Sequence, residues 1–386
     1  MVSTKVGWRS NFLICVIAGL FLCLYACKTT DPGSSGEQQS EEISELSTSE
    51  SLLEEPVDIT TAEVAVELPP KVVRERPTEP EAKTLKKQAG LLGISIERGE
   101  GDDEWILRKG ERSAVLREGS RKAYADGVMV FMNGPLVSKW GRVYLNDADV
   151  DTFLRPVFGD KKTGLKLRSR LIMIDPGHGG AEGGAANNEM GLLEKELTLD
   201  VSNRLAEHLA SKGYATSMTR YDDRVVPLGD RPDIANRAEA GVFVSVHFNA
   251  SLNKNAQGLE TYTLTSEGFV STGGSQVLGP DALKWPGNNF DFLNAELALA
   301  VQRGLLERLQ RVDRGLKKAR FRVLKTLDCP GILVECGFVS HGPEALLVRT
   351  PVYREKLAQA LADAIDSYMI KYAPASLIDA DGAGVN

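Results

Sequence analysis

Three short apolar runs beyond residue 170 are each followed by a residue that can bind or activate a ligand. The runs occupy residues 171–174, 242–246 and 331–334, and the residues that follow them are His178, His247 and Glu335. Short continuous apolar runs separated by helical patterns predict a mostly parallel sheet that is buried on both faces and flanked by helices. Because ligands bind beyond the carboxyl ends of the strands in such sheets, we expect the three side chains to meet at one edge.

Apolar residues recur at four-residue spacing in three further segments, which predicts helices with one apolar stripe. These helices begin near Leu193, Asn294 and Tyr353 and end near Leu209, Leu309 and Tyr368. Glu194 and Glu196 open the first helix, and two positions on a helix differ by about 200°, so only one of them can face the sheet edge. We expect Glu194 to enter the site, because it is next to the stripe and the helix dipole favours a carboxylate there.

Residues 84–160 alternate short apolar runs with turn residues, which predicts a small β-rich α+β module of strands and hairpins. Residues 147–158 are predicted to form a short helix with Asp147 as its N-cap. The stretch 117–158 resembles the small repeat called the copper amine oxidase N-terminal-like domain, found in cell-wall proteins. It contains no histidine, so copper is not implied. A wall-contacting or positioning module and a structural extension of the main domain remain equally open.

The N-terminus has the pattern of an export signal. Lys5 and Arg9 precede an apolar stretch of fifteen residues, 12–26, which has the length of a signal-peptide core and is short for a membrane span. It ends in Leu24-Tyr25-Ala26-Cys27, which resembles a bacterial lipobox with Cys27 as the lipidated residue. Residues 1–27 are therefore predicted to be a signal peptide, with an ordinary cleaved signal or an uncleaved anchor as the alternatives.

Composition separates a linker from the folded parts. With 42% hydrophobic and 26% charged residues, the chain is not a wholly disordered, collagenous or multi-span membrane protein. Residues 31–70 contain eleven acids and no Lys or Arg, so the net charge of −7 belongs to this segment and no basic excess suggests nucleic-acid binding. We predict a disordered acidic linker over 28–83, a catalytic domain over 168–372 and a flexible tail over 373–386.

Two imidazoles and a carboxylate are a common ligand set for catalytic zinc, because three protein ligands leave a position for water. Glu335 would be the free carboxylate that takes a proton at the same edge. An ion pair between Glu335 and an arginine such as Arg314 is the structural alternative for Glu335. For His178 the alternatives are a turn residue and a phosphate-binding loop. A phosphate loop would require Lys and Ser or Thr directly after the glycines, and neither is present. Cys329 and Cys336 are predicted to be free, buried thiols.

The motifs of residues 170–370 resemble the zinc-dependent N-acetylmuramoyl-L-alanine amidases of the type-3 cell-wall class. The resemblance rests on the following segments: Ile174-Asp175-Pro176-Gly177-His178-Gly179-Gly180, Glu194-Lys195, Thr219-Arg220, Ile234-Ala235-Asn236, Ser245-Val246-His247-Phe248-Asn249-Ala250, Gly258-Leu259-Glu260-Thr261-Tyr262, Asp313-Arg314-Gly315-Leu316-Lys317 and Leu333-Val334-Glu335-Cys336-Gly337-Phe338. It implies one zinc ion on His178, Glu194 and His247, Glu335 as the catalytic carboxylate, and supporting roles for Asn249 and Arg314.

The resemblance also implies a reaction and its setting. The substrate would be the amide that joins N-acetylmuramic acid to L-alanine in peptidoglycan, attacked by a zinc-activated water with Glu335 as general base and acid. The implied partners are peptidoglycan and a membrane, reached through a lipid anchor on Cys27, and an activator protein remains open as a third. The protein would be an exported periplasmic or cell-envelope lipoprotein, on the outer membrane where one exists.

Two other functions remain open for these residues. Another zinc peptidase or deacetylase could use the same four residues, and a catalytically inactive peptidoglycan-binding lipoprotein would carry a damaged ligand set.

Some relatives insert an inhibitory helix near residues 265–291, but glycines and prolines interrupt that segment here, so we predict a loop at the substrate rim. His208 is predicted to be an exposed or edge residue of its helix, and His341 a turn residue.

Overall fold

The computed structural model describes residues 84–159, 165–277 and 279–373. The predicted signal peptide with Cys27, the acidic linker over 28–83 and nearly all of the C-terminal tail therefore lie outside the described residues. Among the residues that are described, no helix combines the length and the apolar character that a membrane span requires.

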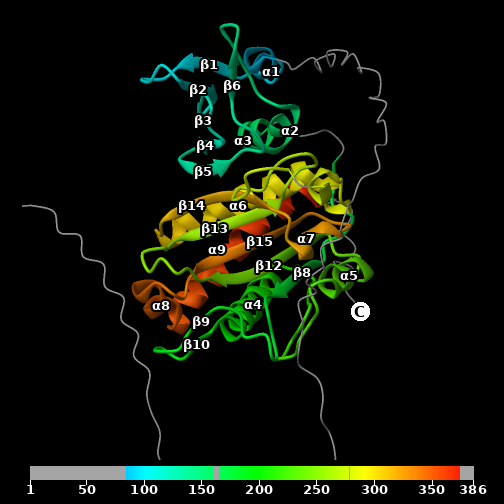
Figure 1. Cartoon of the computed structure of the whole chain (residues 1–386). Helices are drawn as coiled ribbons and strands as arrows, with labels where there is room; N and C mark the ends of the chain where they lie inside the picture. The colour runs from blue at the N-terminus through cyan, green and yellow to red at the C-terminus, as the bar shows by residue number, and fades with distance from the viewer. Residues whose placement is uncertain (1–83, 160–164, 278, 374–386) are drawn as a thin grey trace, which may run out of the picture. The chain divides into compact units, whose positions relative to one another are not determined.

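The fold is built on a mixed sheet whose strands follow the order β1-β2-β3-β4-β5-β14-β13-β15-β12-β8-β11 (Figure 1). The C-terminal strands are β8 (Ile172–Pro176), β11 (Thr216–Met218), β12 (Val242–Asn249), β13 (Leu259–Leu264), β14 (Asp313–Ala319) and β15 (Gly331–Phe338). Neighbouring strands among these six are parallel except for β13 and β15, which run antiparallel. The α/β class with a mostly parallel sheet is thus confirmed.

Strands β8, β12 and β15 are apolar on both faces, as the continuous runs predict. Val244 belongs to the large core formed with α4 (Glu194–Ser211), α6 (Asp291–Leu309) and α9 (Pro351–Tyr372). Its neighbour Phe243 belongs to a second, smaller core. Because successive side chains of a strand point to opposite faces, the two cores lie on opposite sides of the sheet.

Short helices and one hairpin complete the C-terminal part. The second core includes side chains of α5 (Asp230–Arg237) and α7 (Arg322–Lys325). The remaining elements are the hairpin of β9 (Ala186–Asn187) and β10 (Leu192–Leu193), the 3-10 helices η2 (Gly279–Ala282) and η3 (Pro286–Phe290), and α8 (Gly342–Val348). Among the described residues of the segment 265–291 only η2 and η3 are helical before α6 begins, so the prediction that it forms no long helix is confirmed.

The N-terminal described part, residues 84–159, is a strand meander with a helical end. Its elements are α1 (Leu85–Leu91), β1 (Ser95–Arg98), β2 (Glu104–Lys109), β3 (Arg112–Arg117), β4 (Lys122–Ala125), β5 (Val128–Phe131), β6 (Val137–Lys139), β7 (Arg142–Tyr144), α2 (Asp147–Asp149), the π-helix η1 (Val150–Leu154) and α3 (Arg155–Phe158). We call these residues the small module. The predicted Asp147 cap is wrong, because the side chain of Asn146 accepts the hydrogen bond from Asp149 N at 2.9 Å.

The small module joins the larger sheet through one strand pair. Strand β5 runs parallel to β14, with Val130 opposite Leu316. Asp313 at the start of β14 accepts hydrogen bonds from Met129 N at 2.6 Å, from Gln302 Nε2 at 2.9 Å and from Gly315 N at 2.8 Å. One carboxylate therefore connects β5, β14 and α6.

We predict that Asp313→Ala lowers the free energy of unfolding by about 2 kcal/mol, because it removes the acceptor of three hydrogen bonds, two of them from backbone N–H groups. Urea unfolding followed by circular dichroism measures this change. Asp328→Ala is the matched control, since Asp328 is exposed and only its backbone N–H forms a hydrogen bond that the structure records. Equal stability of the two variants would contradict the joining role of Asp313.

Candidate metal centre and its neighbouring carboxylates

The sheet register places three of the polar side chains in one row across neighbouring strands. His247 of β12 is the register partner of Glu335 of β15, and Glu335 is in turn the partner of Glu260 of β13. His178 follows β8, the strand on the other side of β12, by two residues. The predicted convergence of the strand ends is therefore observed.

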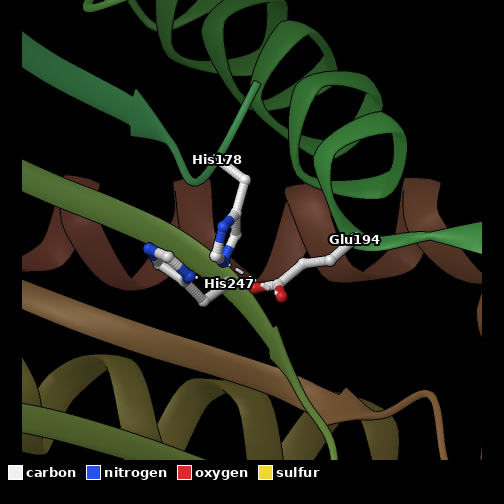
Figure 2. A group of neighbouring side chains, drawn as sticks. All are labelled: His178, Glu194 and His247. Atoms are coloured by element: carbon white, nitrogen blue, oxygen red, sulfur yellow. Dashed lines mark hydrogen bonds and ion pairs between the residues drawn. The ribbon is translucent and has the colours of Figure 1, made fainter. Parts of the chain in front are cut away.

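His178, Glu194 and His247 form a cluster whose potential ligand atoms all lie within 4.8 Å of one another. Figure 2 shows the three side chains pointing toward one another from the loop after β8, the start of α4 and the end of β12. His247 Nδ1 lies 2.9 Å from Glu194 Oε1, and His178 Nε2 lies 3.1 Å from Glu194 Oε2. Two imidazole nitrogens and a carboxylate in this arrangement are a donor set suited to a divalent ion such as zinc.

Glu194 is the first residue of α4 and only 3% exposed. Besides the two histidines, its carboxylate accepts hydrogen bonds from Ala185 N at 2.7 Å and from Phe248 N at 2.9 Å. Burial alone would raise the pKa of Glu194, but the hydrogen bonds and charges of His178 and His247 lower it to about 2. The carboxylate is therefore held as an anion, as a metal ligand must be.

Two glycines make room for the cluster. A Cβ at Gly177 would overlap the ring of His247, and a Cβ at Gly184 would overlap both Glu194 and His178. His178 itself has φ of 60°, in the left-handed region that residues with a side chain rarely adopt. The glycine-rich sequence around His178 thus serves close packing of the three side chains, and nothing in it requires a phosphate.

Buried arginines hold the strained loop that carries His178. Arg231 donates to Asp175 Oδ1 at 2.7 Å, to Pro176 O at 2.8 Å and to His178 O at 2.9 Å. Arg220 donates to Gly177 O at 2.8 Å from the other side. Both guanidinium groups are almost fully buried, so their hydrogen bonds fix the loop before any ligand binds.

Glu335 is half-buried beside the cluster, and its Oε2 has no hydrogen-bond partner among the described residues. Burial and the neighbouring carboxylates of Glu194 and Glu260 raise the pKa of Glu335 well above its ordinary value. The alternative of an ion pair between Glu335 and Arg314 is wrong, because Arg314 bonds to Glu260. Glu335 is thus an unpaired carboxyl group that is available to exchange a proton.

Glu260 is a site neighbour that the sequence analysis did not single out. It is 1% exposed and receives hydrogen bonds from Arg314, from Lys317 at 2.7 Å and from the hydroxyl of Tyr262 at 2.6 Å. Asn249 Nδ2 lies 3.4 Å from the same carboxylate. Burial raises the pKa of Glu260, but these hydrogen bonds outweigh it and leave the pKa below its ordinary value. Asn249 and Arg314 therefore reach the site through Glu260.

The other histidines and the cysteines lie apart from this cluster. His208 is half-buried and its Nε2 is 2.7 Å from Glu355, so it faces α9 from the edge of α4. His341 occupies the N-cap position of α8, in agreement with a turn. Cys329 and Cys336 are free and buried, as predicted.

Comparison with known proteins adds a family match. Residues 172–367, just over half of the chain, match the family model described as N-acetylmuramoyl-L-alanine amidase. The amidase LytC of Bacillus subtilis is 30% identical over 249 residues, which are 62% of this chain and 45% of LytC. The amidase AmiA of Salmonella typhimurium is 30% identical over 230 residues, which are 54% of this chain and 78% of AmiA. This chain thus spans less than half the length of LytC.

The same likeness extends to solved structures. The crystal structure of an N-acetylmuramoyl-L-alanine amidase from Clostridium difficile 630 superposes with a TM-score of 0.44 and is 29% identical in sequence. The superposition covers 52% of this chain and 97% of that chain.

We predict a pH-dependent stability of the metal-free protein from the pKa of Glu194. Because the folded-state pKa of about 2 lies below the ordinary 4.5, the ionised carboxylate stabilises the fold above pH 4.5. This contribution, about 3 kcal/mol, is lost as the pH falls toward 2. Urea unfolding of wild type and Glu194→Gln in the presence of a chelator measures it. The stability difference between them should shrink from pH 6 to pH 3, and a constant difference would contradict the hydrogen-bond assignment.

Proposed function

Because this chain belongs to the N-acetylmuramoyl-L-alanine amidase family, we propose that it hydrolyses the amide between N-acetylmuramic acid and L-alanine in peptidoglycan. One observation carries the proposal at the level of residues. The two imidazoles and the carboxylate of the cluster converge beside Glu335, a carboxyl group with no ion-pair partner among the described residues. Amide hydrolysis requires such a pair of functions, one to polarise the carbonyl and one to move protons.

The cluster has the donor chemistry for zinc, and we assign His178, Glu194 and His247 as its ligands. Zinc held there would polarise the scissile carbonyl and lower the pKa of a water toward neutrality. The chain contributes the geometry. Arg231 and Arg220 hold the His178 loop, while the N–H groups of Ala185 and Phe248 orient the Glu194 carboxylate. A site held in this way loses little free energy to reorganisation when it binds a metal.

We assign Glu335 the proton transfers of the reaction. Its carboxylate would accept a proton from the attacking water and return that proton to the nitrogen of the departing alanine. The high pKa that burial and the neighbouring acids give Glu335 makes it a stronger base than an ordinary glutamate. The glycan would keep the lactyl carboxylate, and the peptide would leave with a free amino terminus.

Glu260 would support this role by binding the nearby cations. Arg314 and Lys317 both bond to Glu260, the register partner of Glu335 on the adjacent strand. If either cation bonded to Glu335 instead, it would lower the pKa of that carboxyl group and weaken it as a base. We therefore interpret Glu260 as the positioning residue that keeps Glu335 unpaired.

The substrate implies that the protein works outside the cytoplasm, since peptidoglycan lies there. The signal peptide of residues 1–27, a lipid on Cys27 and an activator protein remain part of this proposal. The same four residues would also serve a zinc peptidase or deacetylase, and mass analysis of the products separates these activities. An amidase releases stem peptides that begin with free alanine.

We predict that the purified protein binds one zinc ion per chain and that His247→Ala loses it, because the variant lacks one of three ligands. Elemental analysis after dialysis measures the metal content. His208→Ala is the matched control, since His208 bonds to Glu355 away from the cluster. Equal zinc content in wild type and His247→Ala would rule out this site.

We predict that Glu335→Gln retains zinc but lowers kcat for peptide release from peptidoglycan by about 10²–10⁴, the range for loss of a general base. Chromatography and mass spectrometry of the released peptides measure the rate. Glu307→Gln, an exposed change on α6, should leave the rate unchanged. Full activity of Glu335→Gln would overturn the role of Glu335.

A further inference from the structure

The small module contains a cleft of about 830 Å³ that the proposed reaction does not use. The cleft lies among α1, β1, β2 and β7. Its lining is Thr84, Leu85, Lys86, Lys87, Gly90, Ile94, Ser95, Ile96, Trp105, Gly141, Arg142 and Val143. A cleft of this size with an apolar floor and a few convergent polar groups has the character of a ligand site.

The charge of this cleft has one sign. Lys86, Lys87 and Arg142 are exposed at the lining, which includes no Asp or Glu. None of the three cations has an ion-pair partner among the described residues. Elsewhere in the module Arg112 pairs with Asp126 and Arg117 pairs with Glu104. As far as the described residues extend, the cleft therefore presents positive charge that no carboxylate pairs with.

Aromatic surface accompanies these cations. The ring of Trp105 lines the cleft and is fixed by a hydrogen bond from Nε1 to Glu118 at 2.9 Å and by Arg98, which stacks 3.9 Å from the ring centroid. Trp140, next to the lining residue Gly141 but not itself in the lining, is 74% exposed, and Lys139 Nζ lies 4.0 Å from its ring centroid. The fixed ring of Trp105 provides a flat apolar face with little loss of conformational entropy, against which the C–H face of a sugar ring can pack.

We propose that this cleft binds a carboxylate-bearing glycan strand. The sugar rings would pack on Trp105 and Trp140, and the carboxylates would pair with Lys86, Lys87 and Arg142. This proposal rests on the proposed function, because the amidase reaction would itself produce such a strand. Cleavage of the muramoyl amide leaves a lactyl carboxylate on every sugar that loses its peptide. Binding of this product would keep the enzyme on glycan from which it has already removed the peptides, close to muramoyl amides that are not yet cleaved.

Charge complementarity favours this occupant over an uncharged sugar. Intact strands carry their charge on the peptides, whereas peptide-free strands carry it on the glycan itself, with one lactyl carboxylate on every second sugar. Three cations around an aromatic floor match a ligand in which carboxylates and apolar ring faces alternate along one chain. A neutral chitin oligosaccharide offers the ring faces alone and should bind more weakly.

The test measures binding of the full-length protein to peptide-free glycan strands of N-acetylglucosamine and N-acetylmuramic acid, by calorimetry at low salt. We expect these strands to bind at least tenfold more tightly than chitin oligosaccharides of equal length. Lys87→Glu/Arg142→Glu should weaken glycan binding at least tenfold, and Trp140→Ala should weaken both ligands. The matched control is Lys254→Glu/Lys356→Glu, which makes the same change in charge at two exposed lysines outside the cleft.

Hydrolysis of a small soluble muramoyl-peptide is measured on the same variants, so that the two proposals can fail separately. Unchanged glycan binding by the cleft variant would overturn the cleft site whether or not hydrolysis occurs. If the wild-type protein binds glycan but does not hydrolyse the muramoyl-peptide, the amidase proposal is overturned and the glycan site stands. Equal binding of charged and neutral strands, or a cleft-dependent preference for anionic lipid vesicles over glycan, would also overturn the proposed occupant.

Discussion

The register of three neighbouring strands is the constraint on which the site depends. His247, Glu335 and Glu260 occupy one row across β12, β15 and β13, so each position is fixed by the backbone hydrogen bonds of the sheet. A shift of one residue in β15 would turn the side chain of Glu335 to the opposite face. The apolar residues on both sides of β15 prevent such a shift, because it would exchange the residues of the two cores.

Three carboxylates meet in this row and beside it, and each is stabilised differently. Glu194 is held as an anion by two backbone N–H groups and the two histidines. Glu260 is held by Arg314, Lys317 and Tyr262. Among the described residues no Lys or Arg bonds to Glu335, and burial together with the two neighbouring anions raises its pKa. In the proposed mechanism Glu194 would bind the metal, Glu260 would hold the nearby cations and Glu335 would transfer protons.

Periodicity predicted most of the elements that create this arrangement. The apolar runs predicted β8, β12 and β15, because a strand that is buried on both faces consists of consecutive apolar residues. The four-residue spacing predicted α4, α6 and α9, because a helix that is buried along one side has apolar residues at that spacing. The position of Glu194 followed from the start of α4. The small module was harder to predict, since β4 is short and alternates exposed with buried residues, while all three residues of β6 are exposed. Asn146 also caps the helix in place of Asp147.

The role of Glu260 could not be derived in this way. Arg314 and Lys317 are more than fifty residues from Glu260 along the chain, and β13 joins β15 in the antiparallel direction, which apolar runs do not encode. A buried glutamate inside an apolar strand, as in Gly258-Leu259-Glu260, is the one local signal. It indicates a partner without identifying it.

A crystal structure of the zinc-loaded protein, with anomalous diffraction to locate the ion, would show whether His178, Glu194 and His247 bind one metal ion beside an uncoordinated Glu335. We expect one strong anomalous peak for an ion that is bound by His178, Glu194 and His247. The carboxylate of Glu335 should lie nearby without coordinating the ion, and Arg314 should still bond to Glu260. A peak at another position, or Glu335 as a ligand of the ion, would contradict this expectation.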